Sequence, residues 1–432
     1  MNGRGARIVL ACWGTYGDLF PTIGLALALK ARGHRPLVAT CDYYRPVIDS
    51  LALDFHSLPP DIDPADTALL ARVMHPRSGP KVLFQEMLMP AVRESYAALD
   101  AAVEGADLLI SHPATPAAPL VGRRRGMPWL ATVLSPMSFF SAYEVPDLRW
   151  PYVTWRLARA AGPKLGRWLL AAARFSTRGW MSPVERLREE LGLPEAGHPL
   201  FSGQFSPHGT LAMFPSVLAE PQLDWPPQVT RTGFVPYNGP EAMPAELARF
   251  LDEGPAPIVF TLGTSAAGVP VPFYRESAQA AAALGARAVL LTGKNGANRL
   301  SGSLPPGVIA VDYAPHAELF PRAAAIVHQA GMGTTAQALR AGKPTLCVPY
   351  ANDQPENARR VERLGVGRTL YPGRYGSRRV AQELNVLLGN AQHRSRAQTV
   401  GQAVRAVVPH AARPTEMVEA KVVEKNFGSG HA

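Results

Sequence analysis

Short runs of apolar residues alternate with helical patterns along this chain, and this alternation limits the possible folds more than any other feature. Residues 8–13 are apolar at every position, as expected of a strand that is buried on both faces of a sheet. A glycine-containing loop follows, and residues 22–32 then have a helical pattern that Pro21 is predicted to open and Gly33 to close. Together with a strand at residues 36–40, this segment is predicted to form a βαβ unit.

The same alternation continues through both halves of the chain. In the first half, further strands are predicted at residues 108–110 and 129–134. In the second half, strands are predicted at residues 258–262, 288–291, 308–311, 325–328 and 345–348, and helices at residues 273–284, 334–341 and 355–364. Such alternation is typical of parallel sheets with helices on both faces. The predicted fold class is therefore α/β, with two Rossmann-like, doubly wound domains facing each other across a cleft.

The length of 432 residues fits two domains of roughly 200 residues each. A proline-rich stretch, residues 215–244, separates the two alternating halves and is predicted to contain a linker. We expect an N-terminal domain at residues 1–225, a linker at 226–245, a C-terminal domain at 246–408 and a C-terminal tail at 409–432. One arrangement for the tail is to pack on the first domain.

The composition excludes several classes of protein. Hydrophobic residues make up 47% of the chain and charged residues 18%, which excludes a disordered or fibrous protein. The cysteines Cys12, Cys41 and Cys347 are far apart, which excludes a disulfide scaffold or a zinc finger and fits a reducing compartment. The apolar runs are too short to span a membrane, and no signal peptide is expected at the N-terminus. We therefore expect a cytoplasmic protein.

The net charge of +10 leaves two interpretations open for one segment. The chain has no Lys/Arg block of the kind that binds nucleic acid, so no nucleic-acid partner is expected. Residues 149–178 carry seven basic residues and no acidic one, interleaved with Trp150, Trp155 and Trp168. This pattern fits a helix that lies on a membrane surface, at the inner face of the membrane. It also fits a solvated basic face whose aromatic side chains pack on the core, and Gly162-Pro163 interrupts the helical pattern.

The segment with the strongest functional signal is residues 312–367. It contains His-Gln-Ala-Gly-Met-Gly-Thr-Thr at residues 328–335, between a predicted strand and a predicted helix. Glycines let a backbone approach an anion closely, a helix start offers free N–H groups, and threonine and histidine side chains add donors. The segment therefore predicts a diphosphate site, although a glycine-rich turn alone is weak evidence.

A second polar group follows about 20 residues later. Residues 353–357 read Asp-Gln-Pro-Glu-Asn at the start of another predicted helix. A carboxylate accepts hydrogen bonds and an amide both donates and accepts, so Asp353 and Gln354 suit the hydroxyls of a sugar. The alternative is that Asp353 caps the helix and Asn357 lies on the surface.

Together these segments resemble the donor-binding signature of the family 1 inverting nucleoside-diphosphate-sugar glycosyltransferases, which have the GT-B fold. The signature begins with aromatic-x-Pro-His/Gln, here residues 313–316, continues with His-x-Gly-Gly-x-Gly-Thr, here residues 328–334, and ends with Pro-x-x-x-Asp/Glu-Gln-x-x-Asn-Ala, here residues 349–358. One departure is Ala330, where the pattern has its first glycine. The backbone N–H remains there, so we expect a small effect unless the position needs a positive φ.

The resemblance covers nearly the whole chain. Residues 14–21, Gly-Thr-Tyr-Gly-Asp-Leu-Phe-Pro, look like the bacterial form of the family's first loop, which is similar in antibiotic, macrolide and sterol glycosyltransferases. The segments that most resemble the rhamnolipid-type rhamnosyltransferases are Ser135-Pro136 and residues 211–215, 224–226 and 232–234. Residues 60–100 and 140–210 match least well, and these segments would determine the acceptor.

The resemblance implies that the C-terminal domain binds the donor and the N-terminal domain the acceptor. Tyr313 would flank the nucleobase, and backbone atoms near Ala314 would bind the edge of the base. The diphosphate would be held by His328, Met332, Gly333 and Thr334, with Thr264 and Ser265 as second candidates. Asp353 and Gln354 would hold the sugar hydroxyls. No metal or other cofactor is expected, because a helix dipole and a histidine can stabilise the leaving diphosphate.

The resemblance also implies a catalytic base in the first loop. Many relatives have histidine there, whereas this chain has Asp18, which could take a proton from the acceptor hydroxyl. The alternative for Asp18 is an ordinary helix N-cap, three residues before Pro21. His112 and His34 are weaker candidates for the base, and His34 is expected to be structural. The acceptor-side candidates are Thr15, Tyr16, His112, Ser135 and Met137.

These roles imply transfer of a hexose, with inversion, from a UDP- or dTDP-sugar to a hydroxyl of a small, largely apolar acceptor such as a natural product, a phenol or flavonoid, or a lipid. The Asp353-Gln354 pair suits a sugar with a full set of hydroxyls, which favours UDP-glucose. A dTDP-rhamnose-dependent rhamnosyltransferase is the alternative within the family. A non-catalytic, glycosyltransferase-like partner protein should lack these residues, and a sugar-nucleotide epimerase does not need the bulky apolar residues at 129–175.

Overall fold

The chain folds into two compact units. The computed structural model describes residues 5–63, 66–146, 160–263, 272–293, 300, 302–407 and 412–428. The first unit comprises Met1–Asp63, Pro80–Tyr237 and Val408–Ala432, and the second comprises Pro64–Gly79 and Asn238–Val407. The sequence had suggested that residues 64–79 belong to the first domain, whereas their contacts group them with the second unit.

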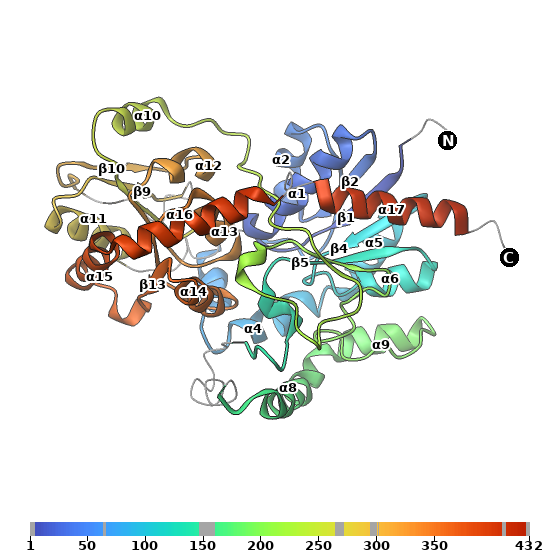
Figure 1. The fold of residues 1–432 in the computed structure, drawn as a ribbon. Coiled ribbons are helices and arrows are strands. Elements are labelled where there is room, and N and C mark those ends of the chain that lie inside the picture. Colours follow the sequence, from blue (N-terminus) through green and yellow to red (C-terminus); the bar gives the residue numbers. More distant parts are fainter. Residues whose placement is uncertain are drawn as a thin grey trace. The chain divides into compact units, whose positions relative to one another are not determined.

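The first unit is built on a parallel sheet of seven strands (Figure 1). The strands are β1 (Arg7–Ala11), β2 (Arg35–Thr40), β3 (Asp54–Ser57), β4 (Leu108–Ser111), β5 (Trp129–Val133), β6 (Thr210–Ala212) and β7 (Val229–Arg231). Their spatial order is β3-β2-β1-β4-β5-β6-β7, so the winding direction reverses between β1 and β4. In open α/β sheets, ligands bind outside the carboxyl ends of the strands at such a reversal.

Helices cover the sheet of the first unit. The α-helices are α1 (Tyr16–Ala31), α2 (Arg45–Ser50), α5 (Val92–Ala102), α6 (Ala118–Arg125), α8 (Pro163–Thr177), α9 (Ser182–Glu190) and α17 (Ala412–Gly428). The 3-10 turns are Asp42–Tyr44, Pro136–Phe139, Arg178–Met181 and Ser216–Leu218, and Val82–Leu88 is a π-helix that follows the short α4 (Gly79–Lys81). None of the described helices has the length and apolarity needed to cross a membrane.

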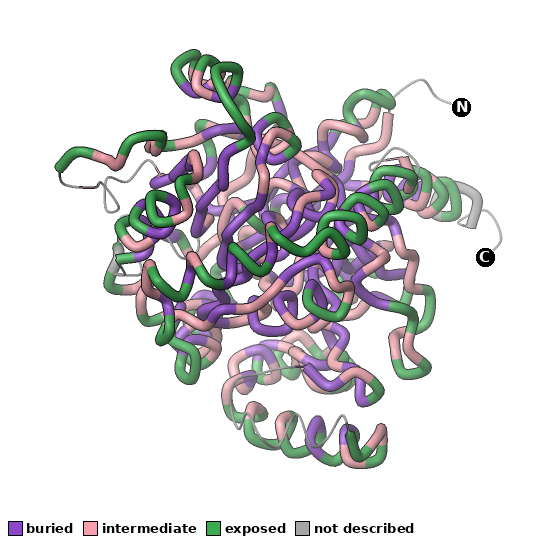
Figure 2. Tube along the Cα trace, turned by 60° about the vertical axis from the view of Figure 1, so that its left-hand side comes forward, coloured by how far each residue is buried: buried purple, intermediate pink, exposed green. Residues whose placement is uncertain are grey.

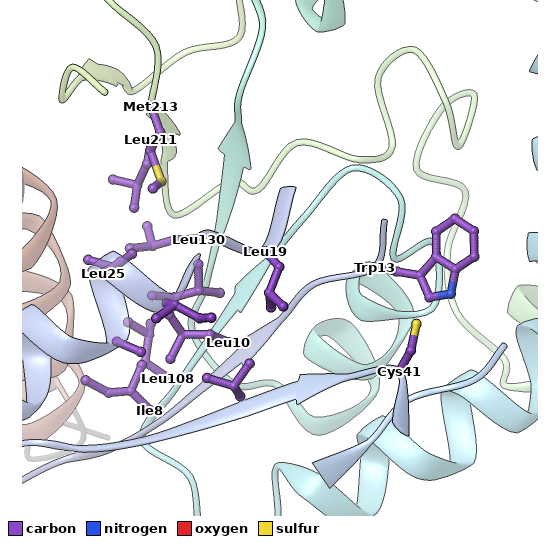
Figure 3. Packing of buried hydrophobic residues seen from close by; sticks show 14 of the residues in the cluster. Ile8, Leu10, Trp13, Leu19, Leu25, Cys41, Leu108, Leu130, Leu211 and Met213 are labelled. Carbon is purple, nitrogen blue, oxygen red and sulfur yellow. The ribbon is translucent and has the colours of Figure 1, made fainter. Parts of the chain in front are cut away.

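The main core of the first unit lies between β1 and α1 (Figure 3). Ile8 and Leu10 on β1 pack with Leu25 of α1 and with Leu108 and Leu130 of the neighbouring strands. All five side chains are at most 1% exposed. Burying such a side chain contributes about 1.5–3 kcal/mol, so the continuous apolar runs seen in the sequence are the residues that hold the sheet together.

Helix α1 begins earlier than the sequence suggested. Thr15 is its N-cap and Asp18 is its N3 residue, and the two form a capping box. Pro21 therefore lies inside the helix rather than at its start. The carbonyl of Asp18 accepts a hydrogen bond from the hydroxyl of Thr22 (3.2 Å). The sequence Thr-x-x-Asp is the capping-box signal that could have revealed this start.

The proline-rich stretch between the units is not entirely a linker. β7 lies inside it and pairs in parallel with β6, so part of the expected linker is an edge strand of the first sheet. The last helix also belongs to the first unit. Glu419 on α17 accepts from Arg32 at the end of α1 (2.8 Å) and lies 3.2 Å from Nε2 of His34. His34 therefore has a structural role, as expected.

The second unit contains a parallel sheet of six strands. The strands are β8 (Ile258–Thr261), β9 (Ala288–Leu291), β10 (Val308–Val311), β11 (Ala325–His328), β12 (Thr345–Cys347) and β13 (Gly367–Thr369). The order β10-β9-β8-β11-β12-β13 reverses between β8 and β11. The predicted strands β8 to β12 are all confirmed, and with them the α/β class of both units.

Helices also cover the second sheet. They are α3 (Thr67–Val73), α10 (Ala245–Asp252), α11 (Phe273–Ala283), α12 (His316–Leu319), α13 (Met332–Ala341), α14 (Gln354–Arg363), α15 (Ser377–Gly389) and α16 (Ala391–Ala406), with 3-10 turns at Phe320–Arg322 and Pro372–Arg374. Figure 2 shows the sheet strands mostly buried and the outer helix faces exposed. All three cysteines are free and buried.

Candidate functional site

The signature segments of the second half meet at the carboxyl edge of the second sheet. His328 ends β11, and it lies in register with Thr261 on β8 and with Cys347 on β12. The loops that follow these three strands therefore start side by side. This is the reversal point of the sheet, where the fold favours ligand binding.

The N-terminus of α13 is open. Gly331 is the N-cap and provides no side-chain hydrogen bond, and the first N–H bonded within the helix is that of Thr335, which donates to the carbonyl of Gly331 (2.9 Å). The N–H groups of Met332, Gly333 and Thr334 precede that bond. Free N–H groups and the positive end of a helix dipole attract an anion, so this helix start is suited to an anion, and the diphosphate site stays a prediction.

His328 adds a buried donor to this helix start. Its side chain is 0% exposed, and its Nδ1 accepts the N–H of Ala330 (3.0 Å). Burial, reinforced by the neighbouring His316, lowers the pKa of His328 to about 3. The ring is therefore neutral at pH 7 with its proton on Nε2, and Nε2 is buried without a hydrogen-bond partner among the described residues. A buried N–H without an acceptor is costly, so an anionic oxygen that binds there would remove this cost.

The glycine-to-alanine departure at Ala330 has a structural consequence. Ala330 has φ = 67°, in the left-handed region. A residue with a Cβ is strained there by about 1–2 kcal/mol. The sequence predicted a small effect of alanine in place of glycine only if φ at this position did not need to be positive. Since φ is positive, the backbone at Ala330 is strained.

Gln329 is a buried polar residue that the sequence interpretation did not single out. It is 3% exposed, and its Oε1 has no hydrogen-bond partner among the described residues. A Cβ at Gly263, where φ is +63°, would lie only 2.2 Å from Nε2 of Gln329. Glycine at the end of β8 thus makes room for the Gln329 side chain. The next residues, Thr264 and Ser265, lie outside the described residues, so their predicted phosphate contacts stay predictions.

Asn357 joins the two parts of the signature. Its Nδ2 donates to the carbonyl of Ala330 (3.0 Å) and to Oδ2 of Asp353 (2.7 Å). Asn357 is 0% exposed, so the alternative that it lies on the surface is wrong. Asp353 occupies the N-cap position of α14 but makes no side-chain capping bond. Its carboxylate is instead fixed by Asn357 beside the glycine-rich turn.

Gln354 has a partly structural role. It is 2% exposed, and its Oε1 accepts the N–H groups of Tyr350 (2.9 Å) and Ala351 (3.3 Å). The carbonyl end of the amide thus holds the loop after β12 in shape. The NH₂ end is the part of this side chain that is left for a sugar hydroxyl.

The residues expected at the nucleobase lie before α12. The Tyr313 hydroxyl donates to the carbonyl of Asn238, which fixes the ring. Ala314 is 0% exposed and packs in the core with Leu319, so only its backbone is suited to contact a base. The roles assigned to both residues stay predictions.

Asp18 lies at the corresponding edge of the first sheet. Its Oδ2 accepts the N–H of Thr15 (2.8 Å), and a Cβ at Gly14, where φ is +146°, would come within 2.3 Å of the same oxygen. Glycine is therefore required where the loop approaches the carboxylate. Asp18 is not the N-cap, since Thr15 holds that position, but it does have a structural hydrogen bond.

His112 follows β4, directly across the reversal point of the first sheet from the Asp18 loop. Its Nε2 lies 3.5 Å from Oδ1 of Asp18, and its Nδ1 accepts the N–H of Ala114 (3.2 Å). Burial lowers the pKa of His112, although Asp18 and a hydrogen bond to the Trp13 backbone oppose the shift. Burial thus favours the neutral ring, which is hydrogen-bonded to the Trp13 backbone and lies close to the Asp18 carboxylate.

The remaining acceptor-side candidates belong to neighbouring parts of the same unit. Tyr16 packs on Phe20 and Tyr44, with ring centroids 5.1 and 5.0 Å apart. Ser135 is buried just after β5, and Met137 is half-buried in the following turn. Their roles toward an acceptor stay predictions.

A cavity that is partly open to solvent adjoins His112. Its wall is largely apolar, with prolines from the loop after β4 and from α6, Val184 of α9, and Pro199. The polar part of the lining comes from Ser111, His112, Thr115, Arg123, Glu185, Arg188 and Gln204. A cavity with apolar walls and several polar groups is one place where a small molecule can bind.

Comparisons with known proteins assign this chain to a family. The profile described as "Erythromycin biosynthesis protein CIII-like, C-terminal domain" matches residues 277–424. The O-mycaminosyltylonolide 6-deoxyallosyltransferase of Streptomyces fradiae is 32% identical over 417 residues, which cover 93% of this chain and 94% of the relative. The chain belongs to the family 1 glycosyltransferases. The glycosyltransferase is also 28% identical to the L-demethylnoviosyl transferase of Streptomyces niveus over 436 residues, 96% of this chain and 97% of that one.

A solved structure supports the GT-B fold of the glycosyltransferase. The Streptomyces sp. SF2575 glycosyltransferase SsfS6, complexed with thymidine diphosphate, superimposes with a TM-score of 0.67 at 21% identity, covering 96% of this chain and 99% of that one. Within its second unit, the glycosyltransferase brings together His328, the start of α13 and, through Asn357, Asp353. Within its first unit it brings together Asp18 and His112.

Proposed function

We propose that this glycosyltransferase moves a 6-deoxyhexose from a thymidine diphosphate donor to a hydroxyl of a small, largely apolar natural product, with inversion and without a metal. The observation that carries the proposal is the buried Nε2–H of His328, which has no hydrogen-bond partner among the described residues, next to the open N-terminus of α13. These donors suit the negative charge that a diphosphate gains as it leaves.

The reaction consists of one displacement. The acceptor oxygen forms a bond to C1 of the sugar while the bond from C1 to the diphosphate oxygen breaks. The electron pair of that bond goes to the diphosphate, whose charge the N–H groups of α13 and His328 stabilise. Attack from the side opposite the leaving group inverts C1, and the acceptor proton goes to Asp18.

Asp18 is a better candidate for the base than His112. The Nδ1 of His112 already accepts a backbone N–H, and its Nε2 faces the carboxylate 3.5 Å away. A neutral histidine in this tautomer carries its proton on Nε2 and has no lone pair left to take another. Oδ1 of Asp18 is therefore the acceptor-side atom, with the His112 ring beside it.

Two observations favour a deoxyhexose over glucose. The two relatives compared above are named for transfer of a 6-deoxyallosyl and a demethylnoviosyl group, and SsfS6 was solved with thymidine diphosphate. In this chain the Oε1 of Gln354 is already bonded to two backbone N–H groups, so the Asp353-Gln354 pair offers fewer free groups than the sequence suggested. UDP-glucose remains the second candidate because the Asp353 carboxylate and the Gln354 NH₂ group can still bind hydroxyls.

A donor panel tests the proposal. Thymidine- and uridine-diphosphate sugars are compared for the rise they cause in melting temperature, and for release of the nucleoside diphosphate with macrolide and other apolar aglycones. A donor at 100 times its dissociation constant should add about 2.7 kcal/mol to the free energy of unfolding. The reactions are run with and without a strong chelator, and no change in rate is expected. The proposal would be contradicted by turnover that requires magnesium or manganese, or by the absence of a rise in melting temperature with every donor tested.

A further inference from the structure

Helix α8 has apolar side chains on two opposite faces. On the inner face, Leu169 and Leu170 are buried against Val145 and Phe201. On the outer face, Trp168 is 65% exposed and Phe175 is 82% exposed. These are the two most exposed aromatic side chains in the described part of the chain.

The two outer rings form one surface. Trp168 and Phe175 are seven residues apart, which is about two helical turns, so their side chains point in directions that differ by roughly 20°. Tyr143, 36% exposed, lies next to this surface, because Arg167 on α8 donates to its hydroxyl (3.1 Å). We call Trp168, Phe175 and the basic residues around them the outer face of α8.

The charge of the outer face has a single sign. The exposed basic residues of α8 are Lys164, Arg167 and Arg174, with Arg178 at its C-cap, and Lys164 and Arg178 lie nearest the two rings. Residues 160–184 contain no Asp or Glu. None of the four cations pairs with a carboxylate of the residues that the structure describes. Arg167 and Arg174 instead lie over the rings of Tyr143 and Phe201, at 5.7 and 5.5 Å from the ring centroids.

We propose that the outer face of α8 binds an anionic lipid surface. Amphipathic helices that lie in the membrane interface combine Trp and Phe with Lys and Arg in this way. Each basic residue near an anionic leaflet contributes about 1 kcal/mol, and the net charge of +10 adds a general attraction. A protein partner would need a surface shaped to fit two projecting rings, whereas a fluid interface needs no matching shape.

Such binding would locate the enzyme where apolar acceptors concentrate. This consequence rests on the proposed acceptor class, but the lipid binding itself does not. α8 would lie flat, with its axis of about 22 Å along the interface. The unit would stay outside the hydrocarbon, in agreement with the absence of a spanning helix among the described residues.

The test is co-sedimentation of the full chain with vesicles of phosphatidylcholine alone and of phosphatidylcholine with phosphatidylglycerol. We expect binding to the anionic vesicles only, weakened by salt because screening shortens from about 8 Å at 0.15 M to about 3 Å at 1 M. Trp168→Ala with Phe175→Ala should lower the affinity at least about tenfold. The matched control is Leu223→Ala, since Leu223 is 88% exposed but lies outside α8.

A second pair of variants tests the charges. Lys164→Gln with Arg178→Gln should weaken vesicle binding about 25-fold, or about fivefold for each charge. Arg378→Gln with Arg394→Gln removes the same charge from exposed positions of the second unit and should have much less effect. Melting temperature and nucleotide binding are measured for every variant and should not change.

Three results would overturn the proposal. They are no binding to anionic vesicles, equal vesicle binding by the α8 variants and their controls, and vesicle binding that does not depend on the anionic lipid. Self-association of the wild-type chain that the Trp168/Phe175 variant abolishes, without vesicle binding, would assign the outer face to a second copy instead. Each result is independent of whether the proposed donor is correct.

Discussion

Nε2 of His112 lies 3.5 Å from Oδ1 of Asp18, while Oδ2 of the same carboxylate accepts the N–H of Thr15 at 2.8 Å. The two oxygens of Asp18 therefore have different roles. Oδ2 stabilises the start of α1 as part of the capping box, and Oδ1 faces the His112 ring. This division allows the structural role and the proposed catalytic role of Asp18 to be tested with a single substitution.

Asp18→Asn should abolish most of the turnover and leave the fold intact. The amide oxygen can still accept the N–H of Thr15, because Asn and Asp are similar capping residues. The amide cannot take a proton, and loss of a general base costs about 100-fold to 10,000-fold in rate. Turnover, melting temperature and donor affinity are measured together, and the last two should hardly change. A stable, fully active Asp18→Asn variant would show that Asp18 only supports the helix.

Asn357→Ala should weaken both stability and donor discrimination. Asn357 is buried and bonds the Ala330 carbonyl and the Asp353 carboxylate, so its loss removes a hydrogen bond to the buried Ala330 carbonyl at a cost of about 1–3 kcal/mol. Asp353, freed from this bond, should then distinguish less well among sugars with different hydroxyl patterns. Urea unfolding and the donor panel measure the two effects. An unchanged ranking of donors would mean that Asn357 stabilises the fold alone.

Ala330→Gly should be close to neutral, because its opposing terms cancel. Relief of the left-handed strain gains about 1–2 kcal/mol, whereas the lost methyl group costs about 0.8 kcal/mol and the more flexible unfolded chain about 0.4–1 kcal/mol. Ala338→Gly is the matched control, since Ala338 is equally buried but lies within α13. There glycine should cost about 1.5–2 kcal/mol, because no strain is relieved. Equal losses at the two positions in urea unfolding would refute the strain at Ala330.

The stability of the ligand-free protein should fall as pH drops below about 6.5. Burial lowers the pKa of His328 to about 3, whereas an unfolded histidine titrates near about 6.5. Between these values only the unfolded chain takes up the proton, so lower pH favours unfolding, by about 2 kcal/mol between pH 7 and pH 5 for this residue. His328→Gln should remove this share of the pH dependence. His393→Gln is the control, and a decline equally steep in wild type and His328→Gln would contradict the burial of a neutral ring.

Strands with clear apolar runs could be predicted from the sequence, including β10 at one edge of the second sheet, whereas the short strands β3, β6, β7 and β13 could not. β1, β4, β5, β8, β9, β11 and β12 are apolar at most positions, because both faces of such interior strands are covered. β3, β7 and β13 are short segments, Asp-Phe-His-Ser, Val-Thr-Arg and Gly-Arg-Thr. They are strands only because a neighbouring strand supplies hydrogen bonds on one side. Their own residues show no apolar pattern from which that pairing could be predicted.

The residue types of the candidate site were also visible in the sequence, but their contacts were not. The spacing of His328, Thr334 and Asp353 indicated a diphosphate and sugar site. The bridge made by Asn357, the positive φ of Ala330 and the burial of Gln329 depend on how β11, α13 and α14 pack. Contacts between segments 20 or more residues apart leave no periodic signal in the chain.

The most direct test of the donor site is the binding of thymidine diphosphate and uridine diphosphate to wild type and to His328→Ala, measured calorimetrically in the presence of a chelator. We predict that the wild-type protein binds at least one of them without metal. His328→Ala should weaken that binding about tenfold to 100-fold, as expected for the loss of one hydrogen bond to a charged group, while His393→Ala should not. Failure of both nucleotides to bind, or equal affinity of wild type and His328→Ala, would contradict the assignment of His328 and the start of α13 to the diphosphate.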